Sequence, residues 1–215
     1  MKYFRRVLLL MAMLCLVAGS ATAQQYTMVA LGFSGFSGTS GSYTGLNNYG
    51  DVVGYDSLTN TAFLYTGGVV TSLGLGYGDG VAINNRGQVA LQSSTSYHSY
   101  LYTPPNLGRI QDLGTLGGLN GMGETYAIAM NDGGTIVGSS SIPSSTTPAW
   151  HAFVYANSHI SDLGVLVPGG NSVARAINTQ GQIVGDSTYP GGYDRAFQMV
   201  SGTMTDMDPA NPALR

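Results

Sequence analysis

Apolar residues occur in short runs that alternate with Gly, Ser, Thr and Asn along nearly the whole chain. Beyond the first 23 residues no stretch keeps a convincing 3.6-residue apolar period, and glycine interrupts every candidate helix. Short alternating runs bounded by turn residues are typical of β-strands. We therefore expect an all-β domain over residues 24–215.

Three sequence markers recur four times in the same order. The first is an Asn-x-x-Gly turn between two short apolar strands, and its first asparagines are Asn47, Asn84, Asn131 and Asn178. The second is a short aromatic strand, found at residues 61–65, 98–102, 151–155 and 195–199. The third is an Asp-Leu-Gly strand or a close variant, at residues 70–74, 110–114, 160–164 and 204–208. A repeated order of markers predicts repeated structural units.

The Asn-x-x-Gly core predicts a tight hairpin with a bulge. Asn is favoured at the first position of a type I turn, and Gly at the fourth accepts positive φ without strain. The strand after the turn is β-branched, and we expect Gly54, Gly138 and Gly185 to end it. Each unit then holds four strands: one on each side of the turn, the aromatic strand and the Asp-Leu-Gly strand.

Units of four antiparallel strands that recur every 40 to 50 residues predict a β-propeller-like array of about four blades. The expected units are residues 34–74, 75–114, 115–164 and 165–208. A strand at residues 26–32 precedes them as a surplus copy of the fourth element, so the array is open or incomplete. The alternative fold is a β-sandwich with coincidental similarity among its strands.

The N-terminal 23 residues have the pattern of a secretory signal peptide. Lys2, Arg5 and Arg6 precede an apolar run over residues 7–17, and a small-residue site ends at Ala23. The apolar run of 11 residues is short of the roughly 20 that span a bilayer. We expect cleavage after Ala23, a secreted or cell-surface location, extracellular or periplasmic, and no membrane span in residues 24–215.

Composition removes several classes of function. Only 9% of the 215 residues are charged, 32 are glycine, and the single cysteine, Cys15, lies in the signal peptide. The mature chain would therefore lack disulfides, thiol nucleophiles and thiolate metal sites. Five dispersed arginines against eleven acidic residues provide no basic patch for phosphates, so we expect no nucleic-acid partner.

Candidate catalytic groups follow the repeat, which favours structural roles. Asp112, Asp162 and Asp206 recur once per unit, as expected of residues that cap turns or bond to backbone rather than of a catalytic carboxylate pair. His98 and His151 occupy equivalent positions, and the three histidines lack zinc-ligand spacing. Glu124 is a lone loop acid, expected to be solvated. We predict no catalytic, cofactor or metal site.

The loop between the second and third strand of every unit carries aromatic residues among Ser, Thr, Gly and Pro. They are Tyr55, Tyr97, Trp150, Tyr189 and Tyr193. Loops on one edge of a rigid scaffold commonly carry recognition, and Tyr and Trp make contact surfaces with little entropy to lose. These five residues are weak candidates for ligand binding, and the structural alternative is that their rings shield the blade edges.

The leading hypothesis is a secreted, non-catalytic repeat protein whose loops bind a glycan, such as an envelope polysaccharide, or another surface protein. A second hypothesis is a secreted polysaccharide-active enzyme on a propeller scaffold, and a third is a structural module without a specific ligand. A second copy of the chain is a further candidate partner, because it could complete an open array.

The third and fourth units resemble the bacterial extracellular repeats of the HAF family. The resemblance rests on His151-Ala152-Phe153 with Asp162-Leu163-Gly164, and on Ala176-Ile177-Asn178 with the Gly181 to Gly185 segment. It weakens in the first two units, where Thr61 and Ser99-Tyr100 depart from the tripeptide and Ser72 replaces Asp. The resemblance implies a bacterial protein with a secreted or surface location and a propeller-like fold. It implies no activity and no functional residues.

Overall fold

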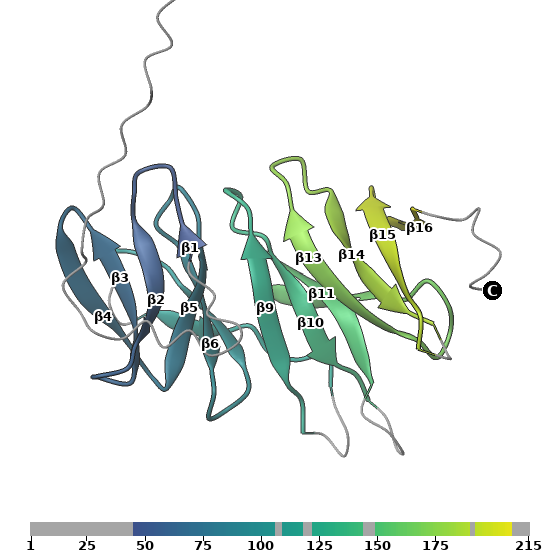
Figure 1. The fold of residues 1–215 in the computed structure, drawn as a ribbon, viewed down its shortest axis with the longest axis horizontal. Helices are drawn as coiled ribbons and strands as arrows, with labels where there is room; N and C mark the ends of the chain where they lie inside the picture. Colours follow the sequence, from purple (N-terminus) through teal and green to yellow (C-terminus); the bar gives the residue numbers. More distant parts are fainter. Residues whose placement is uncertain (1–44, 106–108, 118–121, 144–148, 190–191, 208–215) are drawn as a thin grey trace, which may run out of the picture. The chain divides into compact units, whose positions relative to one another are not determined.

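The computed structural model describes residues 45–105, 109–117, 122–143, 149–189 and 192–207, all within one compact unit, Leu31–Arg215. This part of the chain is all-β, with 16 strands in four four-stranded antiparallel sheets and no helix (Figure 1). The predicted fold class is confirmed: the sheets are blade-like and do not close into a barrel. The β-sandwich alternative is wrong, because a sandwich packs two sheets and the described residues form four.

Each sheet is formed by four strands consecutive in sequence, paired in chain order. Sheet 1 consists of β1 (Gly45–Leu46), β2 (Val52–Asp56), β3 (Thr61–Thr66) and β4 (Val69–Gly76). Sheet 2 consists of β5 (Gly78–Ile83), β6 (Val89–Ser93), β7 (Ser99–Tyr102) and β8 (Ile110–Asp112). Sheet 3 consists of β9 (Thr125–Met130), β10 (Ile136–Ser141), β11 (Trp150–Ala156) and β12 (His159–Gly164). Sheet 4 consists of β13 (Asn171–Ile177), β14 (Ile183–Thr188), β15 (Asp194–Val200) and β16 (Thr203–Asp206). The predicted signal peptide and the strand at 26–32 lie outside the described residues.

The Asn-x-x-Gly turns join the first and second strands of every sheet, as predicted. In the second turn the Gly87 N–H donates to the Asn84 carbonyl at 3.1 Å, and the Asn84 N–H donates to the Gln88 carbonyl at 3.1 Å. Gly87 has φ of +72°, which a side chain would strain. The Asn84 side-chain oxygen also accepts the N–H groups of Arg86 and Gln88, each at 3.0 Å. One asparagine thus holds the whole corner.

Glycines in the second strand do not end it, contrary to the prediction. β2, β10 and β14 continue past Gly54, Gly138 and Gly185, and each glycine lies opposite a phenylalanine of the third strand. A Cβ on Gly138 would overlap the Tyr126 carbonyl oxygen and lie 3.0 Å from the Phe153 ring. The strand needs glycine there because backbone and ring approach too closely for a side chain.

Three apolar clusters join the four sheets, one at each boundary between neighbours in sequence. Their fully buried members include Val53 and Val89 between sheets 1 and 2, Phe153 between sheets 2 and 3, and Phe197 between sheets 3 and 4. Each cluster is formed by one face of a sheet and the facing side of the next. The inner sheets therefore bury both faces, which makes the repeat depend on its neighbours.

Candidate functional site

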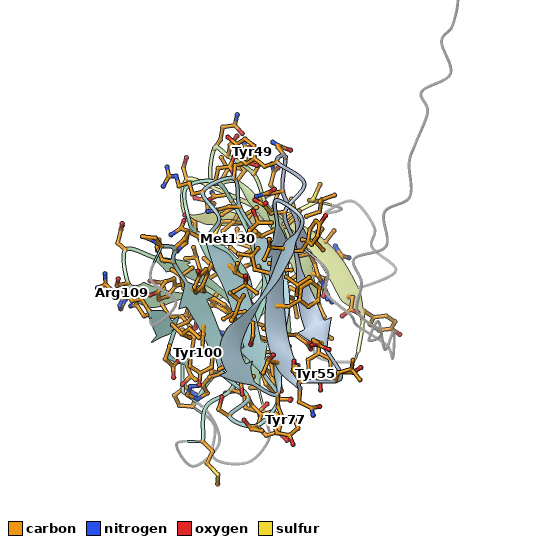
Figure 2. The ribbon with its side chains drawn as sticks, turned by 90° about the vertical axis from the view of Figure 1, so that its left-hand side faces the viewer. Tyr49, Tyr55, Tyr77, Tyr100, Arg109 and Met130 are labelled. Carbon is orange, nitrogen blue, oxygen red and sulfur yellow. The ribbon has the colours of Figure 1, made fainter. Side chains whose placement is uncertain are left out.

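The sheets have two opposite rims. Figure 2 shows Tyr49 at one rim and Tyr55 and Tyr77 at the other. The first, which we call the corner rim, carries the Asn-x-x-Gly turns. The opposite rim carries the turns between the second and third strands, where the sequence places its candidate aromatic residues. All five candidates lie toward this opposite rim, on four different sheets.

Four side chains from sheets 2 and 3 gather at the opposite rim. We call Tyr97, Glu124, Tyr126 and Trp150 the rim cluster. The rings of Tyr126 and Trp150 are 5.5 Å apart between centroids and tilted by 49°. The Tyr126 hydroxyl donates to Glu124 Oε2 at 3.0 Å. The Tyr97 carbonyl accepts the Thr125 N–H at 2.9 Å, which ties the sheet 2 turn to the start of β9.

Backbone geometry presents Tyr97 to solvent. It lies in the turn between β6 and β7 with φ of +59°, and the residue is 49% exposed. Few residues other than glycine adopt this left-handed conformation, since it costs about 1–3 kcal/mol. The backbone bond to Thr125 from the next sheet holds the turn in place. An exposed ring on a strained, anchored turn is a common feature of binding sites.

Charge and burial set the electrostatics of the cluster. Burial, the hydrogen bond to Glu124, the negative charge of that carboxylate and the nearby Tyr97 raise the pKa of Tyr126 to about 12. The phenol is therefore a neutral donor under all physiological conditions. The Asn171 side-chain oxygen on sheet 4 accepts the main-chain N–H of Trp150 at 2.9 Å, which holds the start of β11 in place.

The other candidates lie apart from this cluster. Tyr55 belongs to β2 rather than to a loop, and its hydroxyl donates to Asn60 Oδ1 at 2.6 Å. Tyr189 lies beneath the buried Arg195 guanidinium, with 5.2 Å between the guanidinium carbon and the ring centroid. Tyr193 is exposed just before β15. Trp150 is also a strand residue, the first of β11.

Two acids beside Tyr55 and Tyr77 have shifted pKa values. The Leu58 N–H and the Thr59 hydroxyl donate to Asp56 and lower its pKa. Burial raises the pKa of the Asp79 carboxyl on β5. The shifts have opposite directions because Asp56 is solvated and bonded, whereas Asp79 loses solvent.

Each repeated aspartate pairs with a basic residue at or just before the start of the third strand of its own sheet. His98 Nδ1 lies 2.9 Å from Asp112 Oδ2, and His151 Nδ1 lies 2.8 Å from Asp162 Oδ2. In sheet 4 Arg195 donates to Asp206 at 2.6 Å. Asp112 and Asp162 also accept the N–H groups of Gly114 and Gly164, two residues further along the chain.

Sequence reasoning missed Glu124 and Tyr126 as members of a site. It treated Glu124 as a solvated loop acid, and it did not consider Tyr126. The available signal was that Glu124 is the single glutamate of the chain and stands two positions before an aromatic residue. Among the described residues, no three His, Cys, Asp or Glu side chains gather so that they could hold a metal ion. No helix in the same described ranges could cross a membrane.

No family model matches the chain. The search of curated proteins finds no match either. The similarity to HAF repeats therefore stays a prediction from sequence.

Proposed function

We propose that this protein is a secreted or surface-located, non-catalytic repeat protein that binds a glycan at the rim cluster. The observation that carries the proposal is the grouping of three aromatic side chains from two sheets: the Tyr126 ring lies beside the Trp150 ring, its hydroxyl bonds to Glu124, and Tyr97 is its neighbour from sheet 2. The rings come from a turn and two strands that the sheets hold rigidly.

The chemistry of the cluster suits a sugar. Aromatic faces pack against the C–H faces of a pyranose ring, and they carry large contact area with few rotatable bonds. The Glu124 carboxylate accepts hydrogen bonds from sugar hydroxyls, and such bonds to a charged group are stronger than neutral ones. A site with rings on one side and an acceptor at its edge orients a neutral polyhydroxylated ligand. The carboxylate disfavours a polymer of uronic acids by like-charge repulsion.

The arrangement of the aspartates supports a binding role over hydrolysis. Glycoside hydrolysis uses two carboxyl groups that flank one bond. Asp112, Asp162 and Asp206 lie on three different sheets, and each is engaged by a partner in its own sheet. A secreted polysaccharide-active enzyme is therefore the weaker candidate.

The direct test measures binding of the secreted chain to immobilised neutral and acidic polysaccharides. The informative variant is Tyr97→Asn, because Asn tolerates positive φ and so removes the ring while keeping the turn. Trp150→Ala removes the second ring. We expect each variant to weaken binding at least tenfold, which corresponds to about 1.4 kcal/mol.

The matched control is Tyr49→Ala, which removes an exposed tyrosine from the corner rim. Binding by this control should equal that of the unmodified chain. A chain that binds no polysaccharide, or one whose binding is unaffected by Tyr97→Asn and Trp150→Ala at unchanged melting temperature, would contradict the proposal.

A further inference from the structure

A ladder of asparagine side chains crosses the three boundaries between sheets at the corner rim. The amide nitrogens of three corner asparagines donate to the main-chain carbonyl of the next corner, at 3.2, 3.3 and 3.1 Å; the donors are Asn47, Asn84 and Asn131. Asn178, the fourth corner residue, is exposed, whereas the other three are buried. Its amide donates to Gln182 Oε1 in its own turn, at 2.6 Å, and its second N–H meets no acceptor among the described residues.

A second set of bonds runs beside the first. The Asn48 N–H donates to Asn85 Oδ1, and the Asn85 N–H donates to Asp132 Oδ1, both at 2.9 Å. This series crosses the first two boundaries between sheets, and within the described ranges no bond from the Asp132 N–H to Thr179 continues it across the third. The Thr179 N–H occupies the equivalent donor position on sheet 4. The Asn48 side-chain oxygen occupies the first acceptor position, on sheet 1. Within the described ranges both positions are without such a partner.

The outer face of sheet 4 exposes apolar positions that the inner boundaries bury. Val184 is 38% exposed and Met207 is 57% exposed. The residues equivalent to Val184 in the other sheets are fully buried against the following sheet: Val53, Ala90 and Val137. Those equivalent to Met207 join the same clusters: Leu73, Leu113 and Leu163.

The outer side of sheet 1 exposes the complementary positions. Leu46 is 69% exposed, and Val70 is exposed too. Gly45, next to Leu46, faces sheet 2, since a Cβ there would lie 2.9 Å from the Ile83 nitrogen, and so Leu46 points the other way. The residues equivalent to Leu46 in the other sheets pack against the preceding sheet: Ile83, Met130 and Ile177. The equivalents of Val70 do the same: Ile110, Ile160 and Met204.

We propose that the outer face of sheet 4 docks sheet 1 of a second copy of this chain, in the arrangement that joins neighbouring sheets within one copy. The two ends are complementary in every feature above: sheet 4 offers the donors Asn178 and Thr179, and sheet 1 offers the Asn47 carbonyl and Asn48 Oδ1. A contact between two different faces is heterologous, and it either closes a ring or adds further copies.

Polar residues on the outer face of sheet 4 make this contact weaker than the internal ones. Gln198 stands where Leu64, Leu101 and Val154 stand in the other sheets, and Arg175 forms an ion pair with Asp186 at 2.6 Å on this sheet. The association should therefore be reversible and depend on protein concentration. It does not involve the rim cluster, so its test is independent of glycan binding.

The test uses light scattering on the secreted chain with one charge placed at either end. Val184→Lys blocks sheet 4 and Leu46→Lys blocks sheet 1, and both positions are exposed, so the fold is retained. We expect the unmodified chain to exceed the monomer mass as concentration rises, and each variant alone to stay monomeric. An equimolar mixture of the two variants should recover a two-chain species, because each retains the end that the other lacks.

Leu58→Lys is the matched control, since Leu58 is also 69% exposed but lies in the β2–β3 turn at the opposite rim. It should associate like the unmodified chain. The proposal is overturned if the unmodified chain is monomeric at every concentration, or if either blocking variant keeps its mass. A monomeric mixture of the two variants would also overturn it, because the free sheet 1 of one variant would then fail to bind the free sheet 4 of the other.

Discussion

The side-chain amide of Asn84 donates to the main-chain carbonyl of Asn131, 47 residues later in the chain, at 3.3 Å. The same side chain closes its own turn, where its oxygen accepts the Arg86 and Gln88 N–H groups. One residue therefore shapes a hairpin and joins two sheets. This double role explains why the motif recurs: a unit that keeps its corner also keeps its attachment to the next unit.

Asn84→Ala should cost more stability than Asn178→Ala. Both asparagines make the same bonds within their turns, including one from the amide to the glutamine four residues on, but Asn178 lacks the bond to a following corner. We expect the difference in unfolding free energy to be about 1–2 kcal/mol, the value of a buried hydrogen bond and its stranded acceptor. Urea denaturation of both variants measures it. Equal losses would show that the bond between sheets contributes nothing.

Gly138→Ala should destabilise the protein strongly. The new methyl group would overlap the Tyr126 carbonyl and press on the Phe153 ring, so β9 or β11 would have to shift. We expect a loss of about 3 kcal/mol or more in unfolding free energy. Gly76→Ala is the control, because Gly76 ends β4 and has nothing within 4 Å of its Cβ position. A loss at Gly138 no larger than that of the control would refute this packing.

Tyr155→Phe should leave stability unchanged or raise it. The Tyr155 hydroxyl is buried and has no hydrogen-bond partner in the described structure. An unpaired buried hydroxyl costs about 1–3 kcal/mol, and the ring that packs in the core is retained in the variant. Thermal and urea unfolding check this. A clear loss of stability would reveal a bond that the hydroxyl makes in solution.

The raised pKa of Tyr126 predicts that the protein loses stability more steeply at alkaline pH than a variant without this hydroxyl. Its pKa is raised from 10 to about 12 in the folded protein, so folding favours the neutral phenol. The contribution is complete below pH 10 and is lost as the pH rises through the folded value of about 12, because only the unfolded state ionises readily between them. Unfolding free energies from pH 8 to 12 should fall faster for the unmodified chain than for Tyr126→Phe. Parallel curves would contradict the raised pKa.

Much of the local architecture was predictable because its causes lie close together in sequence. Asn84 and Gly87 specify a turn through preferences of adjacent residues, and the aromatic strands follow from alternation over a few positions. The expectation that Gly138 ends a strand failed because its need for glycine arises from Phe153 and Tyr126, which approach it across the sheet. Sequence showed the glycine but not the atoms that exclude a side chain.

In the candidate site too, some features could be predicted from local sequence and others depend on contacts between distant residues. Tyr97 and Trp150 were identifiable from their place between strands. The contact of Trp150 with Tyr126 depends on how β9 and β11 flank β10 in sheet 3, and the approach of Tyr97 depends on how sheet 2 meets sheet 3. The sequence alone determined the four repeated units, their turns and the residues that alternate within each strand, since hairpins form from short-range preferences. Only the tertiary structure decided that Tyr97 of sheet 2 neighbours Tyr126 of sheet 3, and that Val184 stays exposed where Val137 is buried. Burial and contact between sheets depend on the neighbour that covers a face, and no short window of sequence contains that neighbour.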